Sequence, residues 1–329
     1  MSLSIGIVGL PNVGKSTLFN ALTKKSVPAE NYPFCTIDPS VGIVPVPDER
    51  VQLLSDFSKS KKTIPAVIEF VDIAGLVAGA SKGEGLGNKF LSNIKEVDAI
   101  LHMVRTFEDN SVIHVANKVD PMQDIGVINL ELVLADFETV SKRLANLERD
   151  AKRGVKEAVY EEGILKKVEA VLEKSQMATE ANLSDEEKFK IKSLNLLTLK
   201  PMLYALNISE ANENVEITAP GLWVKIDPVF EKGFDDLIKK SYELLGLETF
   251  FTTGEDETRA WTIKVGSTAP IAGTAIHTDF KDKFIRAETV FWKDLLDAGS
   301  YAEARNKGKV RTEGKEYIVK DGDIIEFKI

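Results

Sequence analysis

Short apolar runs rich in Val, Ile and Leu alternate with helix-like segments through the first part of the chain, and the alternation resumes after residue 200. Such runs separated by helices indicate a mainly parallel sheet covered on both faces. Ligands of these sheets lie beyond the carboxyl ends of the strands, so the functional site is expected at that edge. The expected strands are LSIGIV (3–8), SVGIVPV (40–46), AVIEFVDIAG (66–75), AILHMV (99–104), MLYALN (202–207) and GLWVKI (221–226), with helices to about 23, over 87–95 and over 234–247.

Between residues 129 and 199 apolar positions recur at spacings of three, four and seven, which predicts long amphipathic helices. The charged stretch ERDAKRGVKE at 148–157 interrupts this pattern. Two helices joined by a polar tip are therefore expected to form an antiparallel hairpin that projects from the sheet domain. Two interpretations stay open: a solvated helical insertion, or an arm that touches a large partner.

From about residue 248 the chain changes to short alternating runs such as FIRAETVFW, EYIVKD and DIIEFKI. They predict a small mixed α+β domain with mostly short strands. The expected organisation is a sheet domain from residues 1–128 and 200–246, a helical arm from 129–199, and a C-terminal domain from 247–329.

The residues after the first strand read GLPNVGKS at 9–16, and a helix-like segment follows. In the pattern G-x-x-x-x-G-K-[ST], Gly9 and Gly14 let successive backbone N–H groups wrap a phosphate. Lys15 reaches the outer phosphates, and the Ser16 hydroxyl ligates Mg²⁺. The helix that follows directs the positive end of its dipole at the same anion. The sequence therefore predicts a site for a nucleoside triphosphate and Mg²⁺.

Further candidates for this site follow the predicted strand that ends in FVD. Asp72 is placed to hold Mg²⁺ directly or through water, and Gly75 leaves its amide free to approach a γ-phosphate. Thr36, in the segment NYPFCTIDPS, is placed to supply a second Mg²⁺ hydroxyl when triphosphate is bound. Segments of this kind order around the γ-phosphate and loosen after hydrolysis.

Water activation needs another group, because Leu76 stands where many GTPases have a glutamine. A leucine side chain makes no hydrogen bond. Of the three histidines, His102 lies in a buried strand pattern and His277 in the last domain. His114, in the loop FEDNSVIHVA, is the candidate catalytic group beside Lys15; a solvated loop histidine is the alternative.

Two tetrapeptides compete for the base. Asn117-Lys118-Val119-Asp120 matches the guanine-reading N-K-x-D pattern, but only twelve residues separate it from Val104, and Pro121 follows instead of a sheet strand. A crossover to a parallel strand needs about a dozen residues and usually a helix, so the match is interpreted as accidental. Asn207-Ile208-Ser209-Glu210 directly follows a predicted strand. Ile208 and Glu210 replace the lysine and aspartate, and backbone groups around Ile208 can pair with adenine, which predicts ATP over GTP by roughly 100-fold.

Composition limits the setting of this chemistry. The chain has 329 residues, a net charge of −9 and one cysteine, Cys35. The charge argues against a general basic coat for nucleic acid, and the single thiol excludes an intramolecular disulfide and fits a reducing cytoplasm. No stretch has the apolar length of a membrane span, and we expect no signal peptide and a monomer.

The motifs together resemble the Obg-like ATPases, or YchF group, of the translation-factor-related P-loop proteins. The supporting runs are GLPNVGKST, NYPFCTIDP, DIAGLVAGASKGEGLGNKFL, HVANKVDP, NISE, TRAWTI and IHTDF. The resemblance implies an ATP-hydrolysing domain of the Obg type, a coiled-coil arm, a C-terminal TGS domain of β-grasp type, ribosome association and slow hydrolysis. It also implies that Ser16 and Thr36 bind Mg²⁺ and that Ile208 contacts adenine through its backbone. The residues that it implies for phosphate binding are Asn12, Val13, Gly14, Lys15, Ser16 and Thr17.

One stretch departs from the family pattern. After GLWVKI the family has a small-residue S-A-K signature that supports the base, whereas this chain reads DPVFEKGFDDL with a short connection over 227–233. The principal hypothesis is a Mg²⁺-dependent ATPase switch that docks on the ribosome. The alternatives are a GTPase that reads guanine through Asn117 and Asp120, and a nucleotide-gated RNA-binding protein without meaningful turnover.

Overall fold

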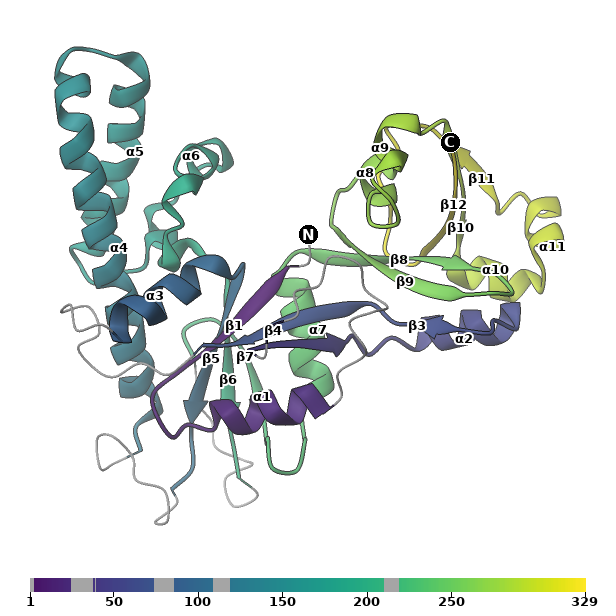
Figure 1. Ribbon diagram of the computed structural model, residues 1–329, viewed down its shortest axis with the longest axis horizontal. Helices are drawn as coiled ribbons and strands as arrows, with labels where there is room; N and C mark the ends of the chain where they lie inside the picture. Colours follow the sequence, from purple (N-terminus) through teal and green to yellow (C-terminus); the bar gives the residue numbers. More distant parts are fainter. Residues whose placement is uncertain (1–2, 25–37, 39, 74–85, 109–118, 210–218) are drawn as a thin grey trace.

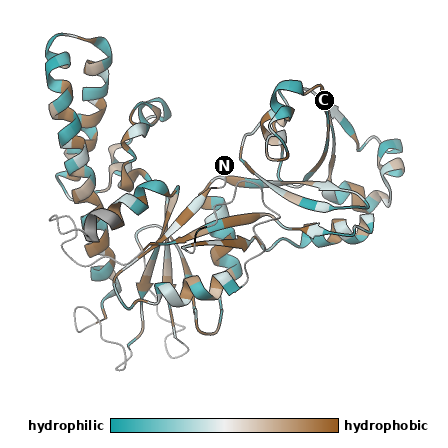
Figure 2. Ribbon diagram, in the orientation of Figure 1, coloured by the Kyte–Doolittle hydropathy of each residue, from teal (hydrophilic) through white to brown (hydrophobic). Residues whose placement is uncertain are grey.

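A six-stranded sheet forms the centre of the N-terminal part of the computed structural model, which describes residues 3–24, 38, 40–73, 86–108, 119–209 and 219–329. Neighbouring strands are parallel except for the β2–β4 pair, as the apolar runs predict. Figure 2 shows hydrophobic residues along these strands. In sheet order the strands are β2 (Val41–Pro45), β4 (Val67–Asp72), β1 (Ser4–Val8), β5 (Ala99–Arg105), β6 (Met202–Asn207) and β7 (Leu222–Ile226).

Three helices accompany this sheet in the predicted places (Figure 1). They are α1 (Lys15–Lys24), α3 (Leu86–Glu96) and α7 (Phe234–Leu244). Helix α1 buries Leu18 and Leu22 completely, so the helix after the phosphate loop is fixed to the sheet. Among the described residues, none of the helices is long and apolar enough to cross a membrane.

The helical arm rises from the sheet as the antiparallel pair α4 (Pro121–Lys152) and α5 (Lys156–Leu172) (Figure 1). Helix α4 begins earlier than the predicted residue 129, because Asp120 caps its N-terminus and Pro121 occupies the first turn. The chain returns through four short helices, η3 (Ala178–Ala181), α6 (Asp185–Lys190), η4 (Lys192–Leu194) and η5 (Leu197–Leu199).

Two polar clasps fix the base of the arm. The buried carboxylate of Asp136 on α4 accepts hydrogen bonds from Leu197 N (2.8 Å), Thr198 N (2.7 Å) and Thr198 Oγ1 (2.6 Å). Lys200 Nζ donates to the carbonyls of Lys95 (3.1 Å) and Val97, at the C-terminal end of α3. The returning segment is therefore tied both to the arm and to the sheet domain.

The second sheet has the β-grasp arrangement that the resemblance implies. Its order is β11-β10-β12-β8-β9-β3, with β12 parallel to β8 and antiparallel to β10. The strands are β8 (Leu247–Thr253), β9 (Thr258–Lys264), β10 (Arg286–Phe291), β11 (Arg311–Glu313) and β12 (Asp323–Lys328). The helices of this region are α8 (Ala269–Gly273), α9 (Asp279–Lys283), α10 (Trp292–Ala298) and α11 (Tyr301–Asn306).

The connection between β2 and β4 packs on this C-terminal sheet, which the sequence patterns did not predict. It contains α2 (Glu49–Ser58) and the two-residue strand β3 (Thr63–Ile64). β3 pairs in parallel with β9, with Thr63 opposite Thr258 and Ile64 opposite Arg259. Leu54 of α2 belongs to a buried cluster that also contains Ile7 of the first sheet and Phe251 of the second, so this N-terminal segment is part of the core that joins the two sheets.

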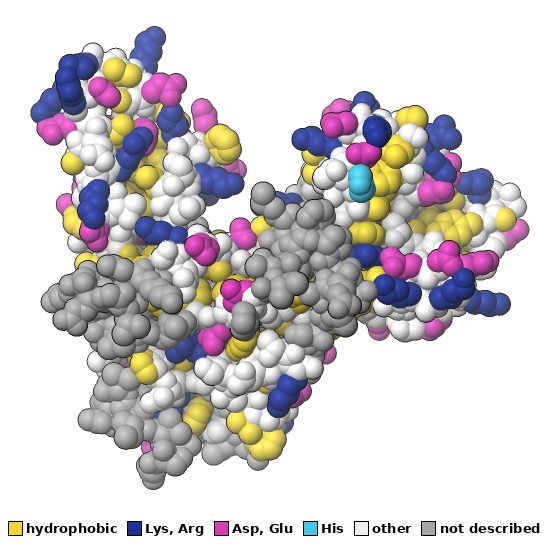
Figure 3. Space-filling model, in the orientation of Figure 1, with side chains coloured by type: hydrophobic (Ala, Val, Ile, Leu, Met, Phe, Trp, Pro, Cys, Tyr) yellow, Lys and Arg dark blue, Asp and Glu magenta, His cyan; other side chains and the backbone are white. Residues whose placement is uncertain are grey.

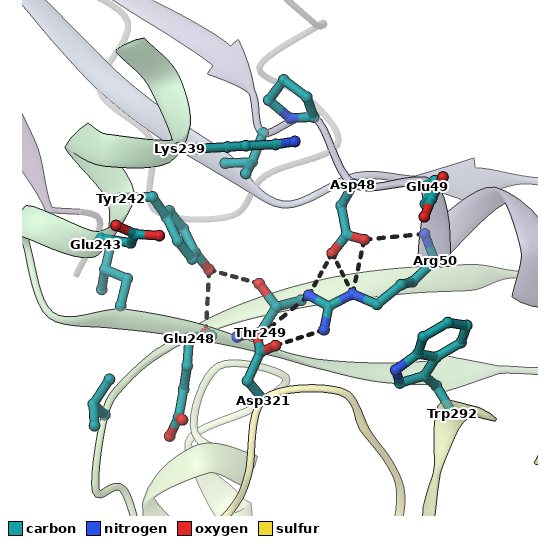
Figure 4. Close-up of a pocket in the computed structure, with 14 residues that line it drawn as sticks. Asp48, Glu49, Arg50, Lys239, Tyr242, Glu243, Glu248, Thr249, Trp292 and Asp321 are labelled. Atoms are coloured by element: carbon teal, nitrogen blue, oxygen red, sulfur yellow. Dashed lines mark hydrogen bonds and ion pairs between the residues drawn. The ribbon is translucent and has the colours of Figure 1, made fainter. Parts of the chain in front are cut away.

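A cavity of about 800 Å³ lies where α7, the start of α2 and the C-terminal domain meet (Figure 4). Arg50 crosses it: Nη2 contacts Asp48 Oδ2 at 2.7 Å, and Nη1 contacts Asp321 Oδ2 at 2.5 Å. Asp321 Oδ1 also accepts from Thr249 N at 3.0 Å. Burial lowers and these carboxylates raise the pKa of Arg50, with a net rise, so the guanidinium is held charged between the domains.

We predict that Arg50→Met lowers the free energy of unfolding by about 2 kcal/mol, because it leaves two facing carboxylates without their shared donor. The matched control is Lys61→Met, which breaks the Lys61–Asp256 pair at 2.8 Å across the same junction. That pair is 78% and 91% exposed, so its loss should cost less than about 1 kcal/mol. Chemical denaturation measures both; equal effects would contradict a clasp at Arg50.

Candidate functional site

The loop between β1 and α1 has the backbone conformation that a phosphate-binding loop needs. Gly9 has φ +155°, and a Cβ there would lie 2.5 Å from Met103 O. Gly14 has φ +98°, and a Cβ there would lie 2.7 Å from Asn207 Nδ2. Asn12 adopts φ 62°, in the left-handed region that asparagine tolerates better than most side chains. A side chain at Gly9 would therefore press on the backbone of β5, and one at Gly14 would displace the side chain of Asn207.

Lys15 lies at the floor of this loop, with its ammonium buried. Nζ donates to Gly9 O at 3.0 Å and to Leu10 O at 2.8 Å. Burial lowers the pKa of Lys15 to about 8, although the charge of Asp72 opposes the shift. An ammonium that is desolvated and held beside the loop is prepared to meet an anion.

Oxygen donors suited to magnesium stand around the loop. The side chains of Ser16 and Thr17 are exposed in the first turn of α1, and Asp72 ends β4. Burial raises the pKa of Asp72, and Lys15 lowers it. In the part of the chain that the structure describes, no three His, Cys, Asp or Glu side chains form a metal-binding cluster. The hydroxyl of Ser16 and the carboxylate of Asp72 are oxygen donors, which suit a hard ion completed by phosphate oxygens and water, as Mg²⁺ is usually held.

Asn207, the last residue of β6, reaches the phosphate loop. Its Nδ2 donates to Val13 O at 2.9 Å, and the residue is buried. Its carbonyl accepts from Thr106 N at 3.1 Å and from Thr106 Oγ1 at 2.8 Å. Sequence reasoning missed Thr106; its only signal is its position directly after β5. The end of β6 is therefore joined to the residues that wrap the phosphates.

One of the two backbone hydrogen-bonding groups of Ile208 already has a partner. Its N–H donates to Ile226 O at 2.9 Å, which continues the pairing of β6 with β7. The other backbone group of Ile208, its carbonyl, is a hydrogen-bond acceptor. A base contact made by Ile208 itself would therefore use an acceptor and not a donor.

Asp120, in the tetrapeptide at 117–120, caps the N-terminus of α4, the first helix of the arm. Its side chain accepts from Gln123 N at 3.1 Å, and its carbonyl accepts from Asp124 N at 2.9 Å. Asn117 lies outside the described residues. The carboxylate that guanine recognition would need is thus used to start α4.

The other histidines are placed as the sequence suggests. His102 is fully buried in β5, where burial is the main cause that lowers its pKa to about 3. His277 is exposed in the C-terminal domain, 3.7 Å from Asp279. Thr36, Gly75, Leu76, His114 and Glu210 lie outside the described residues, so their roles stay predictions.

The connection over 227–233 is a closed turn. Asp227 and Lys232 exchange two backbone hydrogen bonds of 3.1 Å, and Asp227 Oδ1 accepts from Val229 N and Phe230 N. Gly233 has φ +76°, and a Cβ there would lie 2.2 Å from Lys225 O. The short path from β7 to α7 is therefore specified by its own residues.

Two family models match the chain. One, described as a 50S ribosome-binding GTPase, matches residues 4–135. The YchF-GTPase C-terminal model, described as a protein of unknown function, matches residues 247–329. These ranges contain the phosphate loop and the β-grasp sheet respectively.

Relatives match over the whole chain. The ribosome-binding ATPase YchF of Bacillus subtilis is 50% identical, and that of Haemophilus influenzae is 46% identical, each over 100% of this chain and 99% of its own length. The solved structure of the Schizosaccharomyces pombe YchF GTPase has a TM-score of 0.88 and 39% identity, covering 99% of this chain and 98% of that chain. The Bacillus alignment spans 365 positions against 329 residues here, so at least 36 of its positions have no counterpart in this chain.

We predict that triphosphate binding weakens as pH rises through about 8, because Lys15 loses its proton there. A bound anion favours the charged ammonium, so the pKa of Lys15 rises in the complex and binding takes up a proton above pH 8. The triphosphate itself is fully ionised in this range. Calorimetry in buffers of different ionisation enthalpy measures the uptake, and Lys15→Met should abolish it. Proton uptake that persists in this variant would assign the effect to another group.

Proposed function

The chain belongs to the YchF family, and from that membership we propose that it is a Mg²⁺-dependent ATPase that binds the ribosome and prefers ATP to GTP. The observation that carries the proposal is the contact of Asn207 Nδ2 with Val13 O. It supports the tetrapeptide at 207–210 as the base reader, and that tetrapeptide lacks the lysine and aspartate of guanine-specific sites.

Backbone chemistry at Ile208 favours adenine. Because its N–H is engaged with Ile226 O, the group left to meet a base edge is a carbonyl. The N6 amine of adenine donates a hydrogen bond, whereas O6 of guanine only accepts, so guanine would place two acceptors together. Glu210 is longer than aspartate and would sit too far forward to hold guanine N1–H and N2 in the usual way. The preference for ATP follows from both effects.

The phosphate chemistry needs little covalent participation by the protein. Backbone amides of the loop, Lys15 and the N-terminus of α1 stabilise charge on the transferred phosphoryl group. Ser16 and Thr36 would hold Mg²⁺, with Asp72 direct or through water. When bound, this ion neutralises charge on the β- and γ-phosphates. Thr36 and Gly75 would contact the γ-phosphate side, so their surroundings would differ between ATP and ADP.

His114 is the proposed group that orients the attacking water. The support is chemical: Leu76 cannot hydrogen-bond, and His102 is buried in the sheet with its pKa lowered to about 3. A histidine on a loop beyond β5 can approach the phosphates from the same edge of the sheet. Slow intrinsic turnover is expected, because the water is not held by a fixed glutamine.

The arm and the β-grasp domain are the proposed ribosome contacts, and the chain is proposed to work as a cytoplasmic monomer. Figure 3 shows lysine and arginine side chains interspersed with acidic ones over the arm. Because basic and acidic side chains are interspersed over this surface and the chain has a net charge of −9, docking at particular places is favoured over a general attraction to RNA. The C-terminal β-grasp domain is the proposed TGS domain.

Equilibrium titration with non-hydrolysable ATP and GTP analogues tests the base assignment, with an expected preference for ATP of roughly 100-fold. Asn207→Ala should weaken ATP binding, since it removes the bond to Val13. The matched control is Asp120→Asn, because asparagine also caps helices and so α4 is retained. Tighter binding of GTP, or a preference that changes in Asp120→Asn, would favour the GTPase alternative.

Single-turnover hydrolysis with and without ribosomes tests turnover. We expect slow hydrolysis that ribosomes accelerate, and a reduction of about 100-fold or more in His114→Ala with little change in ATP affinity. His277→Ala is the control, since that side chain is exposed in the other domain. Absence of hydrolysis under both conditions would support the nucleotide-gated RNA-binding alternative.

A further inference from the structure

The position of the base follows from two fixed points. Phosphates occupy the loop between β1 and α1, and Asn207 attaches the end of β6 to that loop. In the sheet order β1-β5-β6-β7, the base therefore extends from the loop toward the ends of β6 and β7. Asn207 pairs with Ile226, so the turn at 227–233 begins one residue beyond the level of the base reader. Figure 1 shows this turn, between β7 and α7, at the same end of the sheet as the phosphate loop.

The two residues at the tip of this turn are apolar and exposed, although the backbone of the turn is held by hydrogen bonds to a buried aspartate. Val229 and Phe230 are 74% and 59% exposed, whereas Asp227, which accepts their amide hydrogens, is buried. Glu231 has φ 52° and Gly233 has φ +76°, so the chain is sharply bent on both sides of Lys232. Lys232 Nζ lies 5.9 Å from the centre of the Phe230 ring. A hydrogen-bonded backbone thus presents an aromatic side chain of which more than half is exposed.

We propose that this turn forms the outer wall of the base pocket and that the ring of Phe230 lies against the face of the purine. The inference rests on the proposed nucleotide-binding function and deepens it. A purine is a flat, largely apolar ring system, and an exposed aromatic side chain is the protein group best suited to its face. The edge of the base is read by the backbone at 207–208, and the face is covered from the turn.

Stacking on Phe230 would affect the affinity for both nucleotides and not the preference between adenine and guanine. Each purine has a π-face, so stacking on Phe230 strengthens ATP and GTP binding by similar factors. Discrimination between them remains with the carbonyl of Ile208 and the residues after it. Phe230 is therefore a binding residue whose loss lowers affinity without changing the ratio of the two affinities. A contact on the base edge would change that ratio.

The experiment measures dissociation constants of the full chain for non-hydrolysable ATP and GTP analogues and for inorganic tripolyphosphate, all with Mg²⁺. Phe230→Ala should weaken both nucleotides about tenfold and leave tripolyphosphate within about twofold. Phe230→Tyr, which keeps the ring, should restore the nucleotide affinities. Val229→Ala, on the same turn, is the matched control and should change them by less than about threefold.

Three results would overturn the proposal: unchanged nucleotide affinity in Phe230→Ala, an equal loss for tripolyphosphate, or failure of Phe230→Tyr to restore binding. The Asn207→Ala variant shows whether a negative result concerns the role of Phe230 alone or the proposed nucleotide-binding function. If Asn207→Ala weakens ATP binding and Phe230→Ala does not, the base pocket exists and Phe230 is not its wall. If the unaltered chain binds ATP no more tightly than tripolyphosphate, adenine recognition itself is wrong.

Discussion

The hydrogen bond from Asn207 Nδ2 to Val13 O, 2.9 Å long, is the contact on which the nucleotide site depends. It joins the end of β6 to the loop after β1, although β5 lies between these strands. The contact requires that position 14 have no side chain and that β5 and β6 keep the register that pairs Arg105 with Asn207. Thr106 fixes this register with two hydrogen bonds to the Asn207 carbonyl. A buried amide that lost its acceptor would cost about 1–3 kcal/mol, so the contact stabilises the strand end and the loop together.

The register of β5 and β6 is kept although the whole helical arm is inserted between these two strands in the sequence. The arm leaves the sheet after β5 and returns directly before β6, so a long excursion separates two adjacent strands. Asp136 holds the returning segment to α4, and Lys200 holds it to the end of α3. The arm can therefore project from the domain while the two strands that carry Thr106 and Asn207 stay in place. Because Lys200 binds the last carbonyls of α3, the base of the arm also contacts the helix that follows the Asp72 strand.

Local patterns predicted the phosphate loop and the main strands because each depends on neighbouring residues. Gly9, Gly14 and Lys15 are set by the geometry of one loop, and β5 is buried throughout, so its apolar run is unambiguous. The two-residue strand β3 could not be predicted, because two residues have no periodicity and its partner Thr258 is distant in sequence. Thr106 was missed for the same reason: its role is defined by β6, which the chain reaches only after the arm. The cavity at Arg50 likewise depends on segments distant in sequence coming together.

The tetrapeptides at 117–120 and 207–210 show why a match to a sequence motif does not by itself identify the residues that recognise the base. Guanine recognition needs a carboxylate held at the end of a sheet strand, facing the loop that binds the phosphates. Asp120 has the right letter, but its side chain accepts the amide hydrogen of Gln123 at the start of α4. A carboxylate that caps a helix has an oxygen engaged by the first turn, so turning it toward a base would cost α4 its cap. The tetrapeptide at 207–210 matches the guanine-reading pattern less well, yet Asn207 contacts the phosphate loop through Val13 O. Under the proposed assignment, the base is selected by the strand that reaches the phosphate loop, and the carbonyl of Ile208 favours a hydrogen-bond donor at the purine 6-position.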